Sequence, residues 1–93
     1  MNTSRTAYYV DQTQVPLLSS YVYFQFNFAA RYLIVINDDR SGTNQVIMSF
    51  DGTTKHGQVN ATESLAMDEI DAAGIYLKYA NGAPDFRMMA RPE

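Results

Sequence analysis

Apolar and polar side chains alternate along much of this chain of 93 residues, beginning at residue 21. Tyr21–Phe28 has the sequence YVYFQFNF, in which every second residue is apolar and the residues between are more polar. A period of two places successive side chains on opposite faces of an extended strand, so this segment predicts a half-buried β-strand. Tyr32–Ile36, YLIVI, is a continuous apolar run typical of a central strand covered on both faces.

The second half of the chain carries further strand and turn patterns. Asp51-Gly52 and Asn81-Gly82 are typical of tight hairpin turns, so Gly52 and Gly82 are expected to have positive φ. Ser64–Ala73 fits both alternation and a short helical turn. The other predicted strands are Gln45–Phe50, Thr53–Val59, Ile75–Ala80 and Phe86–Ala90. The residues expected to face the core are Phe24, Phe26, Ile34, Ile36, Met48, Phe50, Ile75 and Leu77.

The spacing of these elements predicts the fold class. Turn residues recur about every eight to twelve positions, and no window has the spacing of a long amphipathic helix. We therefore expect an all-β fold, a small β-sandwich or barrel of seven to eight antiparallel strands with an N-terminal arm. Residues 21–93 are expected to form the β-sandwich domain, and residues 1–20 an N-terminal arm or edge segment.

Residues 1–20 differ from the rest because they are polar and lack clean alternation before Tyr8. Pro16 has no backbone N–H to donate, which excludes a regular central strand around it. A polar terminal segment is usually loose unless another surface holds it. We therefore expect this arm to lie across an adjacent subunit or another protein, with Tyr8, Tyr9 and Leu17 as anchors.

Composition narrows the function classes. The chain has no cysteine, which excludes disulfides and thiolate metal sites. Seven Lys and Arg against ten Asp and Glu give a net charge of −3, which argues against nucleic acid as a partner because phosphate binding needs cationic side chains. The apolar-leaning stretch 21–36 is too short and too polar to span a bilayer as a helix, and the N-terminus lacks a signal-peptide pattern. We expect a soluble protein made in a cytoplasm, with no membrane partner.

Ser49, Asp51 and His56 could suggest the catalytic triad of a hydrolase. Ser49 and Asp51 flank a hairpin turn on the same side of the pleat, however, and no strand–turn–helix elbow presents the serine. The simpler interpretation is a histidine that is exposed or hydrogen-bonded on a strand, and we favour it.

Two acidic groups could suggest other sites. Asp38-Asp39 could suggest calcium, but Arg40 follows directly and no closing glutamate occurs, so a turn with local hydrogen bonds is favoured. A second group could suggest paired catalytic carboxylates, but a domain of this size rarely holds the cleft they need. Its members are Glu63, Asp68, Glu69 and Asp71. We therefore expect no catalytic, cofactor-binding or metal-binding residue, and a protein that is not an enzyme.

A longer motif spans residues 32–82. Its parts are Ile36-Asn37, Ser49-Phe50-Asp51-Gly52, His56-Gly57 and Gly74-Ile75-Tyr76-Leu77-Lys78. This segment is similar to small uncharacterised virion proteins of tailed bacteriophages, which often show a strand ending in Asn, then S-F-D-G-x-x-x-H-G and then G-I-Y-L-K. The resemblance implies a structural role in capsid decoration, the head–tail connector or the tail. It also implies a location in the virion after synthesis in the host cytoplasm.

The amino-acid types favour the same role. Tyr, Phe and Met are enriched at interfaces, and few charges protect the edges of the predicted sheet. We expect a homo-oligomer that contacts copies of itself and other virion proteins. The alternative is a carbohydrate- or receptor-binding module of a tail or fibre, with the pairs Tyr21/Tyr23 and Tyr76/Tyr79 stacking on sugars. The residues expected at an interface are Tyr8, Tyr9, Leu17, Tyr21, Tyr23 and Tyr76.

Overall fold

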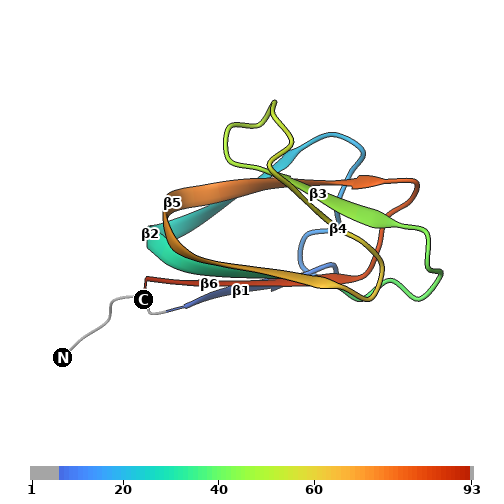
Figure 1. Ribbon diagram of the computed structural model, residues 1–93, viewed down its shortest axis with the longest axis horizontal. Coiled ribbons are helices and arrows are strands. Elements are labelled where there is room, and N and C mark those ends of the chain that lie inside the picture. The colour runs from blue at the N-terminus through green and yellow to red at the C-terminus, as the bar shows by residue number, and fades with distance from the viewer. Residues whose placement is uncertain (1–6, 93) are drawn as a thin grey trace.

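The computed structural model describes residues 7–92, and within this range the chain forms six β-strands and no helix (Figure 1). All strand pairs are antiparallel and make one sheet with the order β1-β6-β2-β5-β3-β4. The strands are β1 Tyr8–Asp11, β2 Val22–Asn37, β3 Gln45–Ser49, β4 Gly57–Val59, β5 Ser64–Ala80 and β6 Phe86–Arg91. The expected all-β, antiparallel fold class is therefore confirmed.

Two long strands explain why the described residues form six strands rather than the expected seven to eight. β2 has 16 residues and joins Tyr21–Phe28 to Tyr32–Ile36, which the sequence predicts as separate strands. β5 has 17 residues and includes both Ile75–Ala80 and Ser64–Ala73, which is extended rather than helical. The strands form a single open sheet with β1 and β4 at its edges, so the expected sandwich or barrel form is not confirmed.

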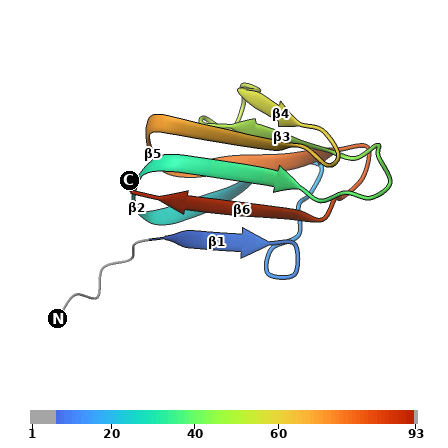
Figure 2. The same ribbon diagram turned by 60° about the horizontal axis from the view of Figure 1, so that its bottom comes forward.

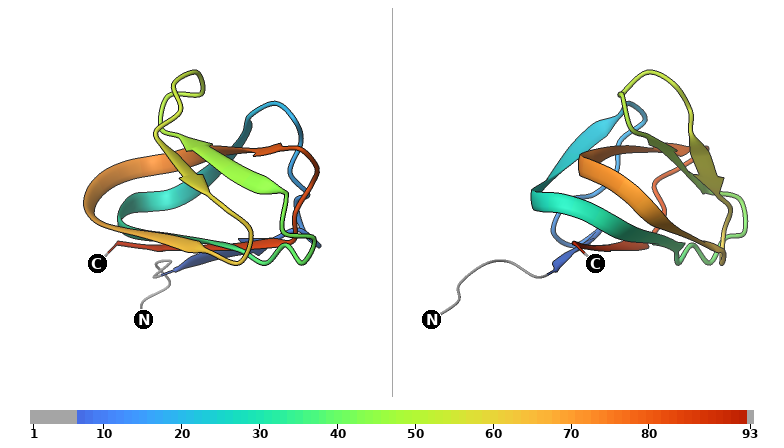
Figure 3. Two further views of the ribbon diagram at one scale, coloured as in Figure 1. Left: turned by 45° about the vertical axis from the view of Figure 1, so that its right-hand side comes forward. Right: turned by 60° about the vertical axis from the view of Figure 1, so that its left-hand side comes forward.

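β2 and β5 bend together, so that two halves of the sheet face one another (Figure 1, Figure 3). We call one the β3 half; it contains residues 22–29 of β2, residues 72–80 of β5, and strands β3 and β4. We call the other the β6 half; it contains residues 32–37 of β2, residues 64–70 of β5, and strands β6 and β1. The apolar core fills the space between them, where the rings of Phe24 and Phe86 lie 6.2 Å apart.

The bend coincides with a break in the alternation of β2. Its pairing with β5 shifts register between Gln25 and Ala30, and again between Ala30 and Tyr32. At the bend of β5, Glu69 has a φ of 58°. Irregularities of this kind are β-bulges, which bend a strand and re-aim its side chains. As a result the buried positions of β2 are even-numbered up to Ala30 and odd-numbered from Leu33 onwards.

Most of the predicted core is confirmed, but three of its residues are wrong. Ile34 and Ile36 lie half-buried on the outer face because the bulge exchanges the faces of β2, and Leu33 and Val35 take the core positions. Phe50 is 37% exposed because it follows the last residue of β3 and lies in the loop before β4. The predicted core residues that are buried are Phe24, Phe26, Met48, Ile75 and Leu77.

The two predicted glycine turns differ in outcome. Gly52 has a φ of 84°, as expected, but it lies in a loop of residues 50–56, so the returning strand β4 is shorter than predicted. Gly82 is not among the positive-φ residues; Asn81, with a φ of 81°, takes that conformation instead. Asn tolerates the left-handed region because its side chain can hydrogen-bond locally, and Asn81 donates to the carbonyl oxygen of Thr43 at 2.9 Å.

The expectation that residues 1–20 lie across a neighbouring subunit is wrong for their described part, residues 7–20. Strand β1 pairs with β6 in the same molecule (Figure 2). Leu17 is buried in the core, and the ring of Tyr8 packs against Phe26 at 5.1 Å. β1 covers the edge of β6, and Tyr8, Val10 and Leu17 add to the core between the two halves. Residues 1–6 lie outside the described residues.

Candidate functional site

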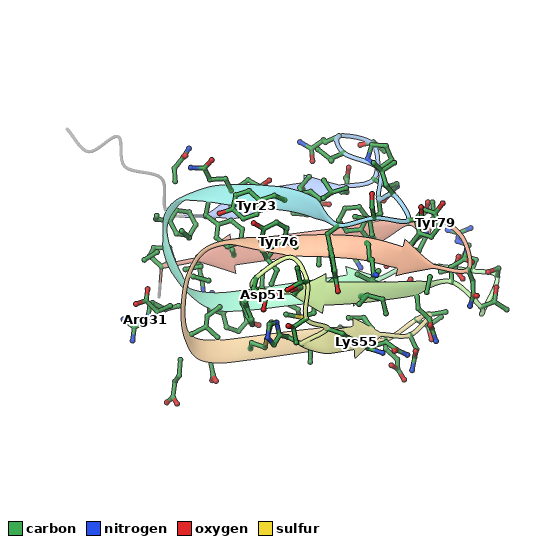
Figure 4. The ribbon with its side chains drawn as sticks, turned by 90° about the horizontal axis from the view of Figure 1, so that it is seen from above. Tyr23, Arg31, Asp51, Lys55, Tyr76 and Tyr79 are labelled. Carbon is green, nitrogen blue, oxygen red and sulfur yellow. The ribbon has the colours of Figure 1, made fainter. Side chains whose placement is uncertain are left out.

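Tyr21, Tyr23 and Tyr76 lie together on the outer face of the β3 half. Tyr23 of β2 and Tyr76 of β5 are direct partners in the sheet, and their ring centroids are 4.6 Å apart at 42° (Figure 4). The Tyr21 ring meets Tyr76 edge-on at 6.4 Å, and the ammonium of Lys78 lies 4.6 Å from the Tyr21 centroid. The structure thus brings together three of the six predicted interface residues, and we call them the tyrosine cluster.

A hollow of about 320 Å³ opens beside this cluster. Gly74 is essential to its shape, because a Cβ at Gly74 would overlap the phenol end of Tyr23 and lie 2.6 Å from the carbonyl oxygen of Phe24. Tyr23 therefore lies against the β5 backbone where any other residue would displace it. We call this feature the tyrosine hollow, and its lining residues are Tyr23, Phe50, Asp71, Ala72, Ala73, Gly74 and Tyr76.

The loop of residues 50–56 beside the hollow is held by two side chains. The Ser49 hydroxyl donates to Asp51 at 2.8 Å and accepts from the backbone N–H of Gly52 at 2.9 Å. The Asp51 carboxylate accepts from the backbone N–H groups of Thr54, at 2.7 Å, and Thr53, at 2.8 Å. These hydrogen bonds hold the pKa of Asp51 far below its usual range, and the bond from Thr54 has the largest effect.

Gly52 brings this loop onto the tyrosine cluster. A Cβ at Gly52 would lie 3.1 Å from the ring of Tyr76, so the loop backbone approaches that ring closely. Ser49 is also the partner of Tyr76 in the sheet. Ser49, Gly52, Gly74 and Tyr76 all belong to the motif on which the resemblance rests, and in space they build one place on the molecule.

His56 does not form a catalytic triad with Ser49 and Asp51. Its Nδ1 accepts a hydrogen bond of 3.0 Å from the backbone N–H of Phe50, and its own backbone N–H donates to Met48 at 2.8 Å. The rings of His56 and Phe50 lie 5.6 Å apart. The Ser49 hydroxyl meanwhile donates to Asp51. The three side chains stabilise the loop, and the Ser49 hydroxyl is not hydrogen-bonded to the His56 ring.

A second hollow, of about 550 Å³, lies where β2 and β5 bend. The guanidinium carbon of Arg91 lies 4.5 Å from the centroid of the Tyr32 ring within it. Figure 4 places Arg31 at this bend, away from Tyr23 and Tyr76. We call it the bend hollow, and its lining residues are Arg31, Tyr32, Asp68, Glu69, Arg91 and Pro92.

The four acidic residues considered for glycoside hydrolysis do not share one cleft. Asp68 and Glu69 line the bend hollow, whereas Asp71 lines the tyrosine hollow. Glu63 accepts a hydrogen bond of 3.2 Å from the backbone N–H of Asn60, which closes the turn before β5. The interpretation of these residues as acidic surface groups fits their exposure.

Asp38 and Asp39 have different partners. Asp38 forms an ion pair with Arg87, with a shortest distance of 2.8 Å. Asp39 is buried, and its carboxylate accepts a hydrogen bond of 2.6 Å from the hydroxyl of Ser41. It also accepts from the backbone N–H and from the side-chain amide of Asn44. The Ser41 bond is the main cause that lowers the pKa of Asp39. Within residues 7–92 no group of three His, Cys, Asp or Glu side chains could hold a metal ion.

The remaining predicted interface residues lie elsewhere. Tyr8 and Leu17 pack in the molecule's own core, which corrects their assignment as anchors on a neighbour. Tyr9 is 50% exposed on the outer face of the β6 half. Tyr79, suggested as a partner of Tyr76 for stacking on sugars, packs against the core and lies apart from Tyr76 (Figure 4).

Sequence reasoning missed Phe50, Asp71 and Gly74 as parts of a site. Alternation assigns Phe50 to the core, and the sequence suggests Asp71 only as one of the paired catalytic carboxylates. Gly74 is the first residue of G-I-Y-L-K in the motif. Its role, which is to leave room for the Tyr23 side chain, depends on the neighbouring strand β2. Only the register of β2 against β5 reveals that relation.

Comparison of the chain with protein-family models, with curated proteins and with solved structures gives no match. No helix in the described range has the length and apolar character needed to cross a membrane.

Proposed function

We propose that this chain is a non-enzymatic structural protein of a bacteriophage virion, which assembles in symmetric copies, together with other virion proteins, on the capsid, head–tail connector or tail. The resemblance of the motif in residues 32–82 motivates the virion role. One structural observation carries the assembly role: an apolar row on the outer face of the β6 half.

The apolar row crosses four neighbouring strands in register. Tyr9 of β1 pairs with Met89 of β6, Met89 with Ile34 of β2, and Ile34 with Ala66 of β5. Tyr9 is 50% exposed and Met89 41% exposed. An apolar surface with a polar rim is typical of a protein interface. The ion pair of Asp38 with Arg87 lies on one side of this row.

The charges beside the row match those of a second copy. Arg91 and Asp68 flank Tyr32 in the sheet, one on β6 and the other on β5. A two-fold axis along β2, between two facing copies, places Arg91 of each copy opposite Asp68 of the other. The same axis sets Ile34 against Ile34 and Met89 against Ala66 of the second copy. An interface of this kind is self-complementary, as two-fold symmetry requires. The occupant that this face favours is therefore a second copy of the chain.

The arrangement of polar side chains supports a role without catalysis. Nδ1 of His56 is occupied by a backbone N–H, and the Ser49 hydroxyl is bonded to Asp51. A nucleophilic serine needs a base within hydrogen-bond reach, and the described side chains provide no such pair here.

The assembly role is tested by the oligomeric state of the full chain. Sedimentation velocity and native mass spectrometry should show a symmetric oligomer for the natural sequence. Met89→Asp, which places a charge in the apolar row, should give a monomer with an unchanged fold. Gln25→Asp, on the exposed face of the β3 half, is the matched control and should leave the oligomer intact. A natural chain that stays monomeric at millimolar concentration would contradict the assembly role.

The virion role needs a separate measurement. Mass spectrometry of purified phage particles should detect the chain at a fixed copy number, and electron microscopy should place it on a symmetric ring or lattice. Its absence from particles made by cells that express it would contradict the proposal.

The second candidate function is a carbohydrate- or receptor-binding module of a tail or fibre. One observation favours it: the tyrosine hollow, with exposed aromatic rings and a carboxylate at its edge. Its test is ligand binding, which is independent of the oligomeric state.

A further inference from the structure

We infer that the tyrosine hollow is a binding site for the ring of a neutral pyranose sugar. This inference deepens the second candidate function by naming the ligand class and the residues that hold it. It does not depend on the apolar row, which lies on the outer face of the other half of the sheet.

Tyr23 supplies a platform for the sugar. Its phenol end lies against Gly74 of β5, where the missing Cβ leaves room, and the side chain is still 46% exposed. An aromatic face carries partial negative charge, which attracts the slightly positive C–H groups on the flat side of a pyranose. Tyr76, at 4.6 Å and 42°, forms a wall beside this platform, and Phe50 lines another side.

The hollow also presents polar groups that form no hydrogen bond within the described part of the chain. Within residues 7–92, no hydrogen bond joins the hydroxyls of Tyr23 and Tyr76 or the carboxylate of Asp71 to another group. A hydroxyl can donate and accept, and a carboxylate accepts, so the three groups together match the hydroxyls of a sugar. Pockets that combine apolar walls with a few convergent polar groups are typical of small-ligand sites.

The volume and the charge of the hollow narrow the ligand class. At about 320 Å³ it has room for one sugar ring but not for a long chain within it. Asp71 is the only ionisable acid or base among its lining residues apart from the two tyrosines. Because no basic side chain is among these lining residues, the Asp71 carboxylate repels acidic sugars and accepts hydrogen bonds from neutral hydroxyls, so the site favours neutral pyranoses.

The loop of residues 50–56 keeps the site open before a ligand arrives. The side chains of Ser49 and Asp51 fix this loop by accepting hydrogen bonds from its backbone N–H groups, and Gly52 lies against Tyr76. A site whose walls are already ordered loses less entropy on binding than one that must form around its ligand. The hydrogen bonds of the motif thus support the wall of the hollow as well as the fold.

The test is saturation-transfer-difference NMR on the full chain with methyl glycosides of glucose, galactose, mannose and N-acetylglucosamine. At least one should receive saturation and shift the amide signals of residues 72–76. Tyr23→Ala should weaken its binding at least tenfold, and Gly74→Ala should do the same by displacing Tyr23. N-acetylneuraminic acid should bind at least tenfold more weakly than that glycoside.

Leu18→Ala is the control, because Leu18 is a large side chain that is 55% exposed and lies outside both the lining of the hollow and the apolar row. Its binding should equal that of the natural chain, and amide spectra should show that each variant is folded. The inference is overturned if none of the four glycosides binds at 50 mM, or if Tyr23→Ala binds as well as the natural chain. Either outcome leaves the assembly role untouched, since that role is read from the oligomeric state.

Discussion

The side-chain amide of Asn37 donates a hydrogen bond of 3.0 Å to the carbonyl oxygen of Val59. The same nitrogen donates to the carbonyl oxygen of Asn44 at 3.0 Å, and the side-chain oxygen accepts from the N–H of Asp39 at 2.9 Å. Asn37 is 1% exposed. It joins the end of β2 to the start of β3 and the end of β4, which needs a short side chain that both donates and accepts.

Asn37→Asp should destabilise the protein by about 3 kcal/mol. The carboxylate cannot donate, so the buried carbonyl oxygen of Val59 and the partly buried one of Asn44 both lose this donor, at about 1–3 kcal/mol for a buried unsatisfied group. Urea unfolding should show a lower midpoint with an unchanged m-value. Asn27→Asp, on an exposed position of the same strand, is the control. Equal midpoints for the two variants would contradict this account of Asn37.

Phe26→Ala should cost about 3–5 kcal/mol, because it empties a buried site in contact with Tyr8 and Phe28. Phe50→Ala should cost less than about 1.5 kcal/mol, because Phe50 is partly exposed in a loop. Thermal unfolding of the two variants measures the difference. A smaller loss for Phe26→Ala than for Phe50→Ala would show that the core is misassigned.

Gly42 and Gly52 separate backbone strain from crowding. Both have φ near 85°, with values of 86° and 84°, but a Cβ at Gly42 would meet no atom within 4 Å, whereas at Gly52 it would meet the Tyr76 ring at 3.1 Å. Gly42→Ala should cost about 1–2 kcal/mol, the price of the left-handed backbone. Gly52→Ala should cost more in the natural chain and the same as Gly42→Ala in a Tyr76→Ala background. A gap that persists without Tyr76 would exclude the ring as its cause.

Stability should fall in acid. In the folded protein, hydrogen bonds lower the pKa of Asp51, the main one being from the backbone N–H of Thr54. They also lower the pKa of Asp39, the main one being from the hydroxyl of Ser41. In the unfolded chain both aspartates have a pKa of about 3.9. A lowered folded pKa gives stability that is present above about pH 4 and is lost as the pH falls towards the folded pKa. Urea midpoints between pH 6 and pH 2 should therefore decline less steeply for Asp51→Asn than for the natural chain. Parallel declines would contradict the role of Asp51.

The proposed two-fold contact predicts a charge-reversal result. Arg91→Asp or Asp68→Arg alone should raise the dissociation constant of the dimer at least tenfold, because each places like charges opposite one another, twice per dimer. The double variant Arg91→Asp with Asp68→Arg should recover most of the natural affinity, as measured by sedimentation equilibrium. Additive losses in the double variant would rule out the pairing of these residues across the axis.

Alternation within single strands was enough to predict the all-β fold class, and it placed five of the eight predicted core residues correctly. Phe24 and Phe26, or Ile75 and Leu77, lie on stretches where the period of two is unbroken. The same rule failed for Ile34 and Ile36 because the register shifts around Ala30 depend on pairing with β5. Neither Ala30 nor Arg31 is a turn residue that would indicate such a shift in the sequence. A change of one residue in register exchanges the faces of a strand.

The candidate sites depend on pairing between distant segments, which a single sequence does not display. Tyr21, Tyr23 and Tyr76 could be selected as exposed aromatics, and the structure shows that they form one cluster. The hollow itself requires Gly74 opposite the Tyr23 side chain, and the apolar row requires β1 beside β6. Residues 7–20 were misjudged for the same reason, since the four residues of β1 are stable only against β6.

The continuity of β2 and β5 through both halves of the sheet makes the molecule a single cooperative unit. Neither half has a complete set of strands of its own, because β2 and β5 each contribute central residues to both halves. Unfolding of one half disrupts β2 and β5, and these strands also supply the hydrogen-bond partners of the other half. A state in which only one half is folded is therefore not stable. A ligand or partner bound on either outer face would therefore protect the whole chain against unfolding, including the opposite face that it never touches.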